Sequence, residues 1–184
     1  DPYGGIVFGT YNEDPDKVKR KPIANLYRLA PNLSLTHLLS NITVSNGIAF
    51  SENENIMYFA DTPTGRIQKF EYTKNFNKFY ELEANMIFKN VGEPDGATVD
   101  IDNNYWSARV RGKCIICVDT KDETIIEKIS LPTNTPTCVT FGGANLNSLY
   151  ITSLRADPTS DNEGGNLHKI ETSTKGRAQL LADI

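Results

Sequence analysis

The sequence predicts an all-β fold in which four-stranded units repeat around a common axis, which is the architecture of a β-propeller. Short runs of β-branched and aromatic residues recur at roughly 8–12-residue spacing and end at Asn, Gly or Pro, with little helical periodicity between them. A hairpin motif also occurs three times, at intervals of about 40–50 residues, which is the usual length of a propeller blade.

The expected strands follow the chain at short intervals. They lie at residues 48–50, 56–60, 67–72, 97–99, 105–107, 114–118 and 125–129. Residues 75–90 are the most ambiguous part, because residues 80–84 fit a helix as well as a strand. We expect an outer strand and its loop there, since the segments on both sides are strands.

Each repeat consists of a first strand, a polar turn and a returning strand. The three hairpins join residues 46–50 to 57–61, residues 95–99 to 105–109, and residues 137–141 to 149–153. Residues 1–10 resemble the turn and returning strand of the same unit without its first strand. We therefore expect one partial propeller domain over residues 1–184, made of a part blade at 1–40 and blades at 41–90, 91–132 and 133–184. Just under four blades cannot close a ring, so we expect the C-terminal part of a larger protein.

The composition excludes several classes of function. The 184 residues include 23 acidic and 19 basic side chains, for a net charge of -4, and this balance leaves no basic face for nucleic acid. No apolar run approaches the ~18–20 residues of a membrane span. We expect a soluble, cytoplasmic protein with no nucleic-acid or membrane partner.

The three cysteines do not suggest a disulfide scaffold or a zinc site. Cys114 and Cys117 have the spacing of a metal-binding pair, but residues three apart in a strand point to opposite faces. We expect both to be buried free thiols.

The repeat brings equivalent residues of successive blades to one mouth of the central channel. Asn46, Asp95 and Thr137 directly precede or begin the three inner strands. An amide and a carboxylate that converge in a channel are hard oxygen ligands suited to Ca²⁺, Mg²⁺ or Mn²⁺. The alternative is that Asn-Gly and Asp-Gly are simply turn dipeptides. Two protein ligands are too few for a tight site, so a further carboxylate and waters would be needed.

A second ring of residues is expected at the ends of the returning strands, on the same face. It comprises Thr10, Asp61, Arg109 and Ser153. The mouth would then carry hydroxyls, a carboxylate and a guanidinium in addition to Asn46 and Asp95.

These motifs resemble one known family along nearly the whole chain. The segments that carry the resemblance are residues 45–51 with 57–62, residues 94–96 with Asp100 and 106–109, and residues 141–146 with 149–153. Together they are similar to the gluconolactonase/regucalcin (senescence marker protein) family. The resemblance implies a six-bladed propeller that holds one divalent cation (Ca²⁺, Zn²⁺, Mn²⁺ or Mg²⁺) in its channel and hydrolyses sugar lactones.

The resemblance also implies roles for individual residues. The family's metal ligands are a Glu near the N-terminus, the Asn of an SNG motif and the Asp of a PDG motif. The last two correspond to Asn46 and Asp95, whereas the Glu has no counterpart in this sequence. Asp95 is the candidate base, although it would be a weak base when bound to a cation and could instead orient a metal-activated water.

Three more residues are candidates for contact with substrate. The family has an acidic substrate contact shortly after a Gly-Thr, and here that position falls near Glu13 or Asp14. Arg109 could steady a substrate hydroxyl or the product carboxylate, or it could pair with Asp61 as a structural contact at the rim.

The function expected from the sequence is metal-dependent hydrolysis of a sugar lactone to the aldonic acid. The cation would polarise the lactone carbonyl, with Asp95 as base or ligand. The alternatives are a non-enzymatic calcium-binding or protein-interaction propeller, and a truncated, catalytically silent product. The pair of Asn46 and Asp95 at equivalent blade positions favours the enzyme, because an interaction scaffold has no need for it.

Overall fold

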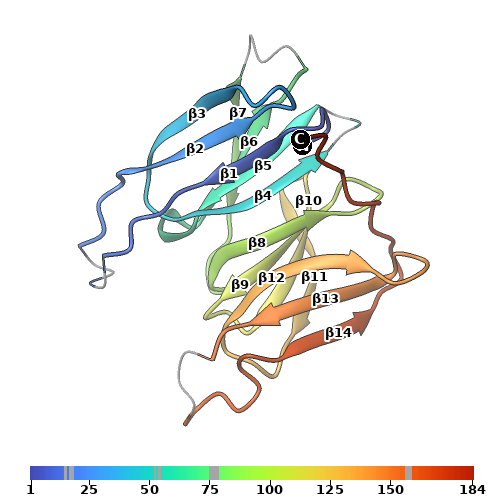
Figure 1. Ribbon diagram of the computed structural model, residues 1–184. Helices are drawn as coiled ribbons and strands as arrows, with labels where there is room; N and C mark the ends of the chain where they lie inside the picture. Colours follow the sequence, from blue (N-terminus) through green and yellow to red (C-terminus); the bar gives the residue numbers. More distant parts are fainter. Residues whose placement is uncertain (15, 17–18, 52, 54, 75–78, 156–158) are drawn as a thin grey trace.

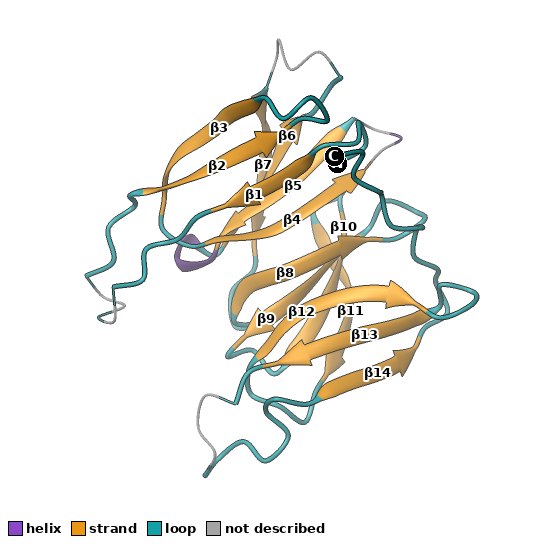
Figure 2. Cartoon of the chain, viewed as in Figure 1, coloured by secondary structure: helices purple, strands orange, loops and turns teal. Residues whose placement is uncertain are grey.

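The fold consists of antiparallel β-sheets connected by turns. The computed structural model describes residues 1–184 apart from 15, 17–18, 52, 54, 75–78 and 156–158, and its described part contains strands and one short 3₁₀ helix (Figures 1 and 2). No helix in this described part is long and apolar enough to cross a membrane. The all-β prediction is confirmed.

The strands form four sheets, each made of a continuous stretch of chain. The first contains β1 (Ile6–Gly9), β2 (Ala24–Leu29) and β3 (Leu35–Ile42). The second contains β4 (Ser45–Ser51), β5 (Ile56–Asp61), β6 (Arg66–Glu71) and β7 (Tyr80–Ile87), with helix η2 (Thr62–Thr64) between β5 and β6. The third contains β8 (Glu93–Val99), β9 (Tyr105–Val110), β10 (Cys114–Asp119) and β11 (Thr124–Ser130). The fourth contains β12 (Pro136–Gly142), β13 (Ser148–Ser153) and β14 (Leu167–Glu171).

The ambiguous segment is a strand. Residues 80–84 lie in β7, which pairs with β6 from Arg66 opposite Ile87 to Glu71 opposite Tyr80, so the strand interpretation is confirmed. Residues 75–78 of the expected loop lie outside the described residues.

The sheets are arranged like successive blades. Strands β4, β8 and β12 are each the first strand of their sheet, and they lie side by side where the sheets meet (Figure 1). The apolar core fills the spaces between sheets in three clusters. These clusters contain Leu26 and Phe59 between the first and second sheets, Tyr58 and Ile116 between the second and third, and Trp106 and Ile151 between the third and fourth.

The two cysteines of the CxxC sequence belong to different clusters. Cys114 packs in the cluster between the second and third sheets, and Cys117 packs in the cluster between the third and fourth. Both thiols are buried and free, as the strand spacing predicts.

Two aspartates close equivalent turns at the beginning of a returning strand. Asp1 accepts hydrogen bonds from the N–H groups two and four residues further on, those of Tyr3 and Gly5. Asp100 accepts from the N–H groups at the same offsets, those of Asp102 and Asn104. The shared pattern supports the assignment of residues 1–10 to the turn and returning strand of a blade.

Candidate metal and substrate site

A β-bulge marks the same place in each of the three inner strands. The pairing shifts between Asn46 and Ala49 in β4, between Pro94 and Ala97 in β8, and between Pro136 and Cys138 in β12. A bulge leaves an extra residue unpaired and turns its side chain away from the regular alternation. Asp95 and Thr137 are among the residues that the bulges leave unpaired. Asn46 lies directly before the bulge in β4.

A threonine connects the two predicted metal ligands. The Asn46 amide Nδ2 donates to the Thr62 Oγ1 at 2.8 Å, and the Thr62 hydroxyl donates to the Pro94 carbonyl at 2.8 Å. Pro94 directly precedes Asp95, so the Asn46 side chain lies within two hydrogen-bond lengths of the Asp95 segment. The segments that carry Asn46 and Asp95 are therefore close together although they lie in different sheets, and the convergence of the two side chains on one ion stays a prediction.

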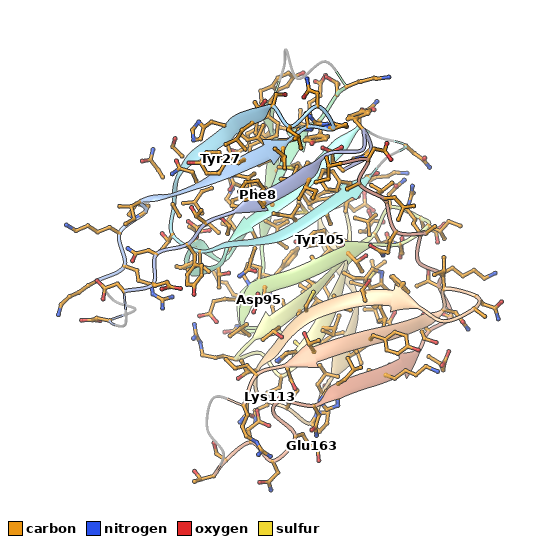
Figure 3. The ribbon with its side chains drawn as sticks, in the orientation of Figure 1. Phe8, Tyr27, Asp95, Tyr105, Lys113 and Glu163 are labelled. Atoms are coloured by element: carbon orange, nitrogen blue, oxygen red, sulfur yellow. The ribbon has the colours of Figure 1, made fainter. Side chains whose placement is uncertain are left out.

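Asp95 is a partly buried carboxylate near the beginning of β8 (Figure 3). Burial raises its pKa to about 6, and a hydrogen bond from the Gly96 N–H offsets this only in part. Within the described part of the chain, the structure records no ion pair to Asp95. A carboxylate that is desolvated and lacks a cationic side chain is suited to bind a metal ion.

Two glycines allow close packing between neighbouring sheets at this site. Gly47 has a positive φ of 61°, and a β-carbon there would overlap the hydroxyl of Tyr105, which donates to the Gly47 carbonyl at 2.8 Å. A β-carbon on Gly96 would lie 2.5 Å from the Cys138 Sγ. The Asn-Gly and Asp-Gly pairs lie within β4 and β8, so their interpretation as simple turn dipeptides is wrong, and the two glycines have a packing role instead.

Gly47→Ala is expected to destabilise the protein by about 2–3 kcal/mol, because the left-handed backbone and the overlap with Tyr105 both oppose a β-carbon. Gly65→Ala is the matched control, since Gly65 has a φ of 70° but open space around its β-carbon position. Thermal melting should show a larger drop for Gly47→Ala than for Gly65→Ala. Equal drops would contradict the close contact with Tyr105.

The expected second ring is wrong for two of its members. Asp61 is 7% exposed and accepts hydrogen bonds from the Thr43 and Val44 N–H groups, so it stabilises the connection between β3 and β4. Arg109 is 0% exposed and donates from Nη2 to the Gly92 carbonyl at 2.6 Å. These side chains face the packed interior because the adjacent sheet covers this side of each strand.

Arg109 also does not form the predicted rim contact. The ion pairs of the described residues include none between Arg109 and Asp61. Its Nε and Nη1 are buried without a hydrogen-bond partner among the described residues, and burial lowers its pKa. Its predicted contact with substrate stays a prediction, and the buried position does not support it.

The two acidic candidates lie in the connection between β1 and β2. Glu13 accepts a hydrogen bond from the Tyr11 hydroxyl at 2.8 Å, and Asp14 accepts one from the Asp16 N–H at 2.9 Å. This connection is tied to the beginning of β4, because the Thr10 carbonyl accepts from the Ser45 hydroxyl at 2.8 Å. It lies at the same end of the sheets as the starts of β4 and β8 (Figure 1). A substrate contact by either residue stays a prediction.

Asn46 and Asp95 provide part of a binding site for a hard divalent cation. The Asn46 Oδ1 and the Asp95 carboxylate are the potential ligands, and oxygen ligands of this kind suit Ca²⁺, Mg²⁺ or Mn²⁺. The described residues contain no group of three or more His, Cys, Asp or Glu side chains that could hold a metal ion alone. A complete site therefore needs ligands beyond these two.

A cavity of about 240 Å³ lies further along β4 and β8 and is also lined by residues 177–180. None of the predicted site residues line this cavity.

Comparison with known proteins identifies the family. Residues 1–155 match the family model described as the SMP-30/Gluconolactonase/LRE-like region. The chain belongs to this family. The resemblance inferred from the SNG and PDG segments is therefore confirmed.

Relatives of known name include lactonases and regucalcins. YvrE of Bacillus subtilis, a putative sugar lactone lactonase, is 31% identical over 96% of this chain and 61% of its own. The pentonolactonase XacC of Haloferax volcanii is 27% identical over 100% of this chain and 64% of its own. The chain spans about three-fifths of the length of these curated relatives.

Solved structures share the fold. A luciferin-regenerating enzyme superposes with a TM-score of 0.88 at 27% identity, covering 100% of this chain and 63% of that one. The regucalcin of Agrobacterium tumefaciens, described as a calcium-binding protein, gives a TM-score of 0.87 at 24% identity, covering 100% of this chain and 62% of that one. The assignment to this fold is confirmed, whereas the count of six blades stays a prediction.

Sequence reasoning missed the residues around the predicted ligands. Thr62 belongs to the segment that carries the family resemblance, but nothing in the sequence indicates that its hydroxyl reaches Pro94, 32 residues away. The proximity of Cys138 to Gly96 likewise depends on how β12 packs against β8. Contacts between separate sheets leave no signal in local sequence patterns.

Proposed function

We propose that the protein carrying this chain hydrolyses a sugar lactone to the aldonic acid, with a divalent cation held in part by Asn46 and Asp95. The observation that carries the proposal is a partly buried carboxylate, Asp95, with no ion pair among the described residues, close to the Asn46 amide on the neighbouring inner strand through the Thr62 hydroxyl and the Pro94 carbonyl. Membership of the SMP-30/Gluconolactonase/LRE-like family and the lactonase relatives support the same reaction.

The chemistry assigns separate tasks to the site. Asn46 and Asp95 would hold a divalent cation in part, and the cation would supply Lewis acidity for the lactone carbonyl. Asn46 and Asp95 provide oxygen ligands from two different strands. Asp95 also accepts a hydrogen bond from the attacking water and so directs that water toward the carbonyl carbon.

The reaction balances without any redox partner. The water oxygen adds to the carbonyl carbon, the ring C–O bond breaks, and the released ring oxygen takes up one of the two protons of the water, while the other stays on the new carboxyl group. The product is a hydroxy acid whose carboxyl group is fully ionised at neutral pH, so each turnover releases one proton to solution.

A pH-stat assay tests this proposal directly. The full-length protein is mixed with glucono-1,5-lactone and Ca²⁺, Mn²⁺, Zn²⁺ or Mg²⁺ in turn, and proton release is compared with the uncatalysed background. We expect catalysed release that EDTA abolishes and that returns when the cation is added back. Release no faster than background with every cation would contradict the lactonase proposal.

The calcium-binding or interaction propeller is the second candidate, supported by the relationship to regucalcins. It predicts a higher melting temperature with Ca²⁺, because a ligand that binds only the folded state stabilises it. Such a shift without proton release would favour this candidate over the enzyme.

A further inference from the structure

Thr62 lies between the second and third sheets and has not been given a role in the proposed site. It is the first residue of η2, directly after β5, and its N–H donates to the Val44 carbonyl at 3.1 Å. Its hydroxyl makes both hydrogen bonds described above, with the Asn46 Nδ2 and with the Pro94 carbonyl. The hydroxyl is therefore held between one predicted ligand and the residue that precedes the other.

The direction of these two hydrogen bonds follows from simple chemistry. A hydroxyl has one proton to donate, and a backbone carbonyl can only accept. The Thr62 proton therefore goes to Pro94, and the Thr62 oxygen must accept from Asn46. Only the Nδ2 of the amide can donate, so the Asn46 Oδ1 faces away from Thr62.

An asparagine without such a partner has no fixed orientation. The two ends of an amide group are nearly equal in shape, so a free Asn46 could present either Nδ2 or Oδ1 to a ligand. Nδ2 is a hydrogen-bond donor and does not bind a cation. Only one of the two orientations is therefore competent for metal binding.

We propose that Thr62 is a positioning residue that orients the Asn46 amide so that its Oδ1 is presented to the cation. The inference rests on the proposed function, in which Asn46 is a metal ligand. Groups that orient metal ligands in this way typically change metal affinity by about 10–100-fold when they are removed.

The first test measures binding of Ca²⁺ alone and of Mn²⁺ alone by titration calorimetry on the full-length protein. Thr62→Val keeps the shape of the side chain but removes the hydroxyl, and we expect affinity to fall about 10–100-fold. Thr62→Ser keeps the hydroxyl and should retain the parent affinity. Thr64→Val is the matched control in the same helix, because the Thr64 hydroxyl donates to the Asp61 carbonyl at 2.7 Å and touches neither ligand.

The second test separates orientation from a general structural role. A carboxylate has two equivalent oxygens, so the orientation of the side chain no longer matters in the Asn46→Asp background. The loss caused by Thr62→Val should therefore disappear when it is combined with Asn46→Asp. If Thr62 merely supported the strands, the loss would persist in both backgrounds.

Melting temperatures in EDTA show whether each variant is folded. If Thr62→Val fails to fold, Thr62→Ala in both backgrounds provides the same comparison. If a folded Thr62→Val variant bound the cation as tightly as the parent, while substitution of Asn46 or Asp95 still weakened binding, the inference would be overturned and the proposed function would stand. Absence of cation binding by the parent protein would instead overturn the proposed function.

Discussion

Asp95→Asn is expected to abolish cation-dependent lactone hydrolysis and, at the same time, to stabilise the metal-free protein above about pH 6. A direct ligand should matter at least as much as the groups that orient ligands, so Ca²⁺ affinity should fall by at least about 100-fold. The gain in stability has a different origin. Asp95 is a partly buried carboxylate without a counterion among the described residues, and an amide is less costly to bury than a charge.

The pH dependence of this gain follows from the raised pKa. The pKa of Asp95 is about 6 in the folded protein, above the ordinary value of 3.8 for an aspartate side chain. The folded state therefore holds the proton more tightly, and the stability of the protein falls as pH rises from about 4 to about 6. Above pH 6 the full penalty is present, and Asp95→Asn removes it. The partial exposure of the group limits the gain to about 1–2 kcal/mol.

Melting curves in EDTA at pH 4 and pH 8 measure this effect. Asp95→Asn should melt higher than the parent at pH 8, by roughly 2–8 °C, with little difference at pH 4. Asp119→Asn is a control of opposite sign, because hydrogen bonds from the Asp122 and Lys121 N–H groups lower the pKa of Asp119. A lower melting temperature for Asp95→Asn at pH 8 would show that the carboxylate is stabilised in the metal-free protein.

Asp100→Ala is expected to destabilise the protein by about 3–5 kcal/mol, because it leaves several donors without an acceptor. Asp100 is 0% exposed and closes the turn between β8 and β9. Among the described residues, it accepts hydrogen bonds from the Asp102 N–H, from the Asn104 N–H and Nδ2, and from the Trp106 Nε1. The indole of Trp106 is itself buried, so its N–H would have no water to replace the carboxylate.

Denaturant unfolding of three variants checks this prediction. Asp100→Asn keeps one oxygen and should lose less stability than Asp100→Ala. Asp102→Ala lies in the same turn with an exposed side chain and should change stability by no more than about 0.5 kcal/mol. Similar losses for Asp100→Ala and Asp102→Ala would contradict the structural role of the Asp100 carboxylate.

Much of the fold could be predicted because its signals are local. Alternating apolar residues and turn residues define strands such as β5 and β9 within a few positions of the chain. The repeat then places Asn46 and Asp95 at equivalent positions, because equivalent blade residues converge around one axis. The CxxC pair was assigned correctly for the same reason, since strand geometry alone separates Cys114 from Cys117.

The prediction of the second ring was wrong for Asp61 and Arg109 because the burial of a side chain depends on segments that are distant in the sequence. Strand periodicity shows that Asp61 and Arg109 end their returning strands, but not which face of each strand the next sheet will cover. Arg109 lies on the same side of β9 as Tyr105, which packs against Tyr58 of the second sheet. That side of the strand is therefore interior.

The sequence by itself determined the strand pattern, the repeat, the family and the two candidate oxygen ligands, because each depends on residue types at short or regular spacings. Tertiary structure alone decided that Asp95 lacks a counterion among the described residues, that Arg109 is enclosed, and that Thr62 joins Asn46 to Pro94. These features arise where separate sheets pack together. Desolvation and hydrogen bonding at such contacts depend on residues tens of positions apart, which local sequence patterns do not encode.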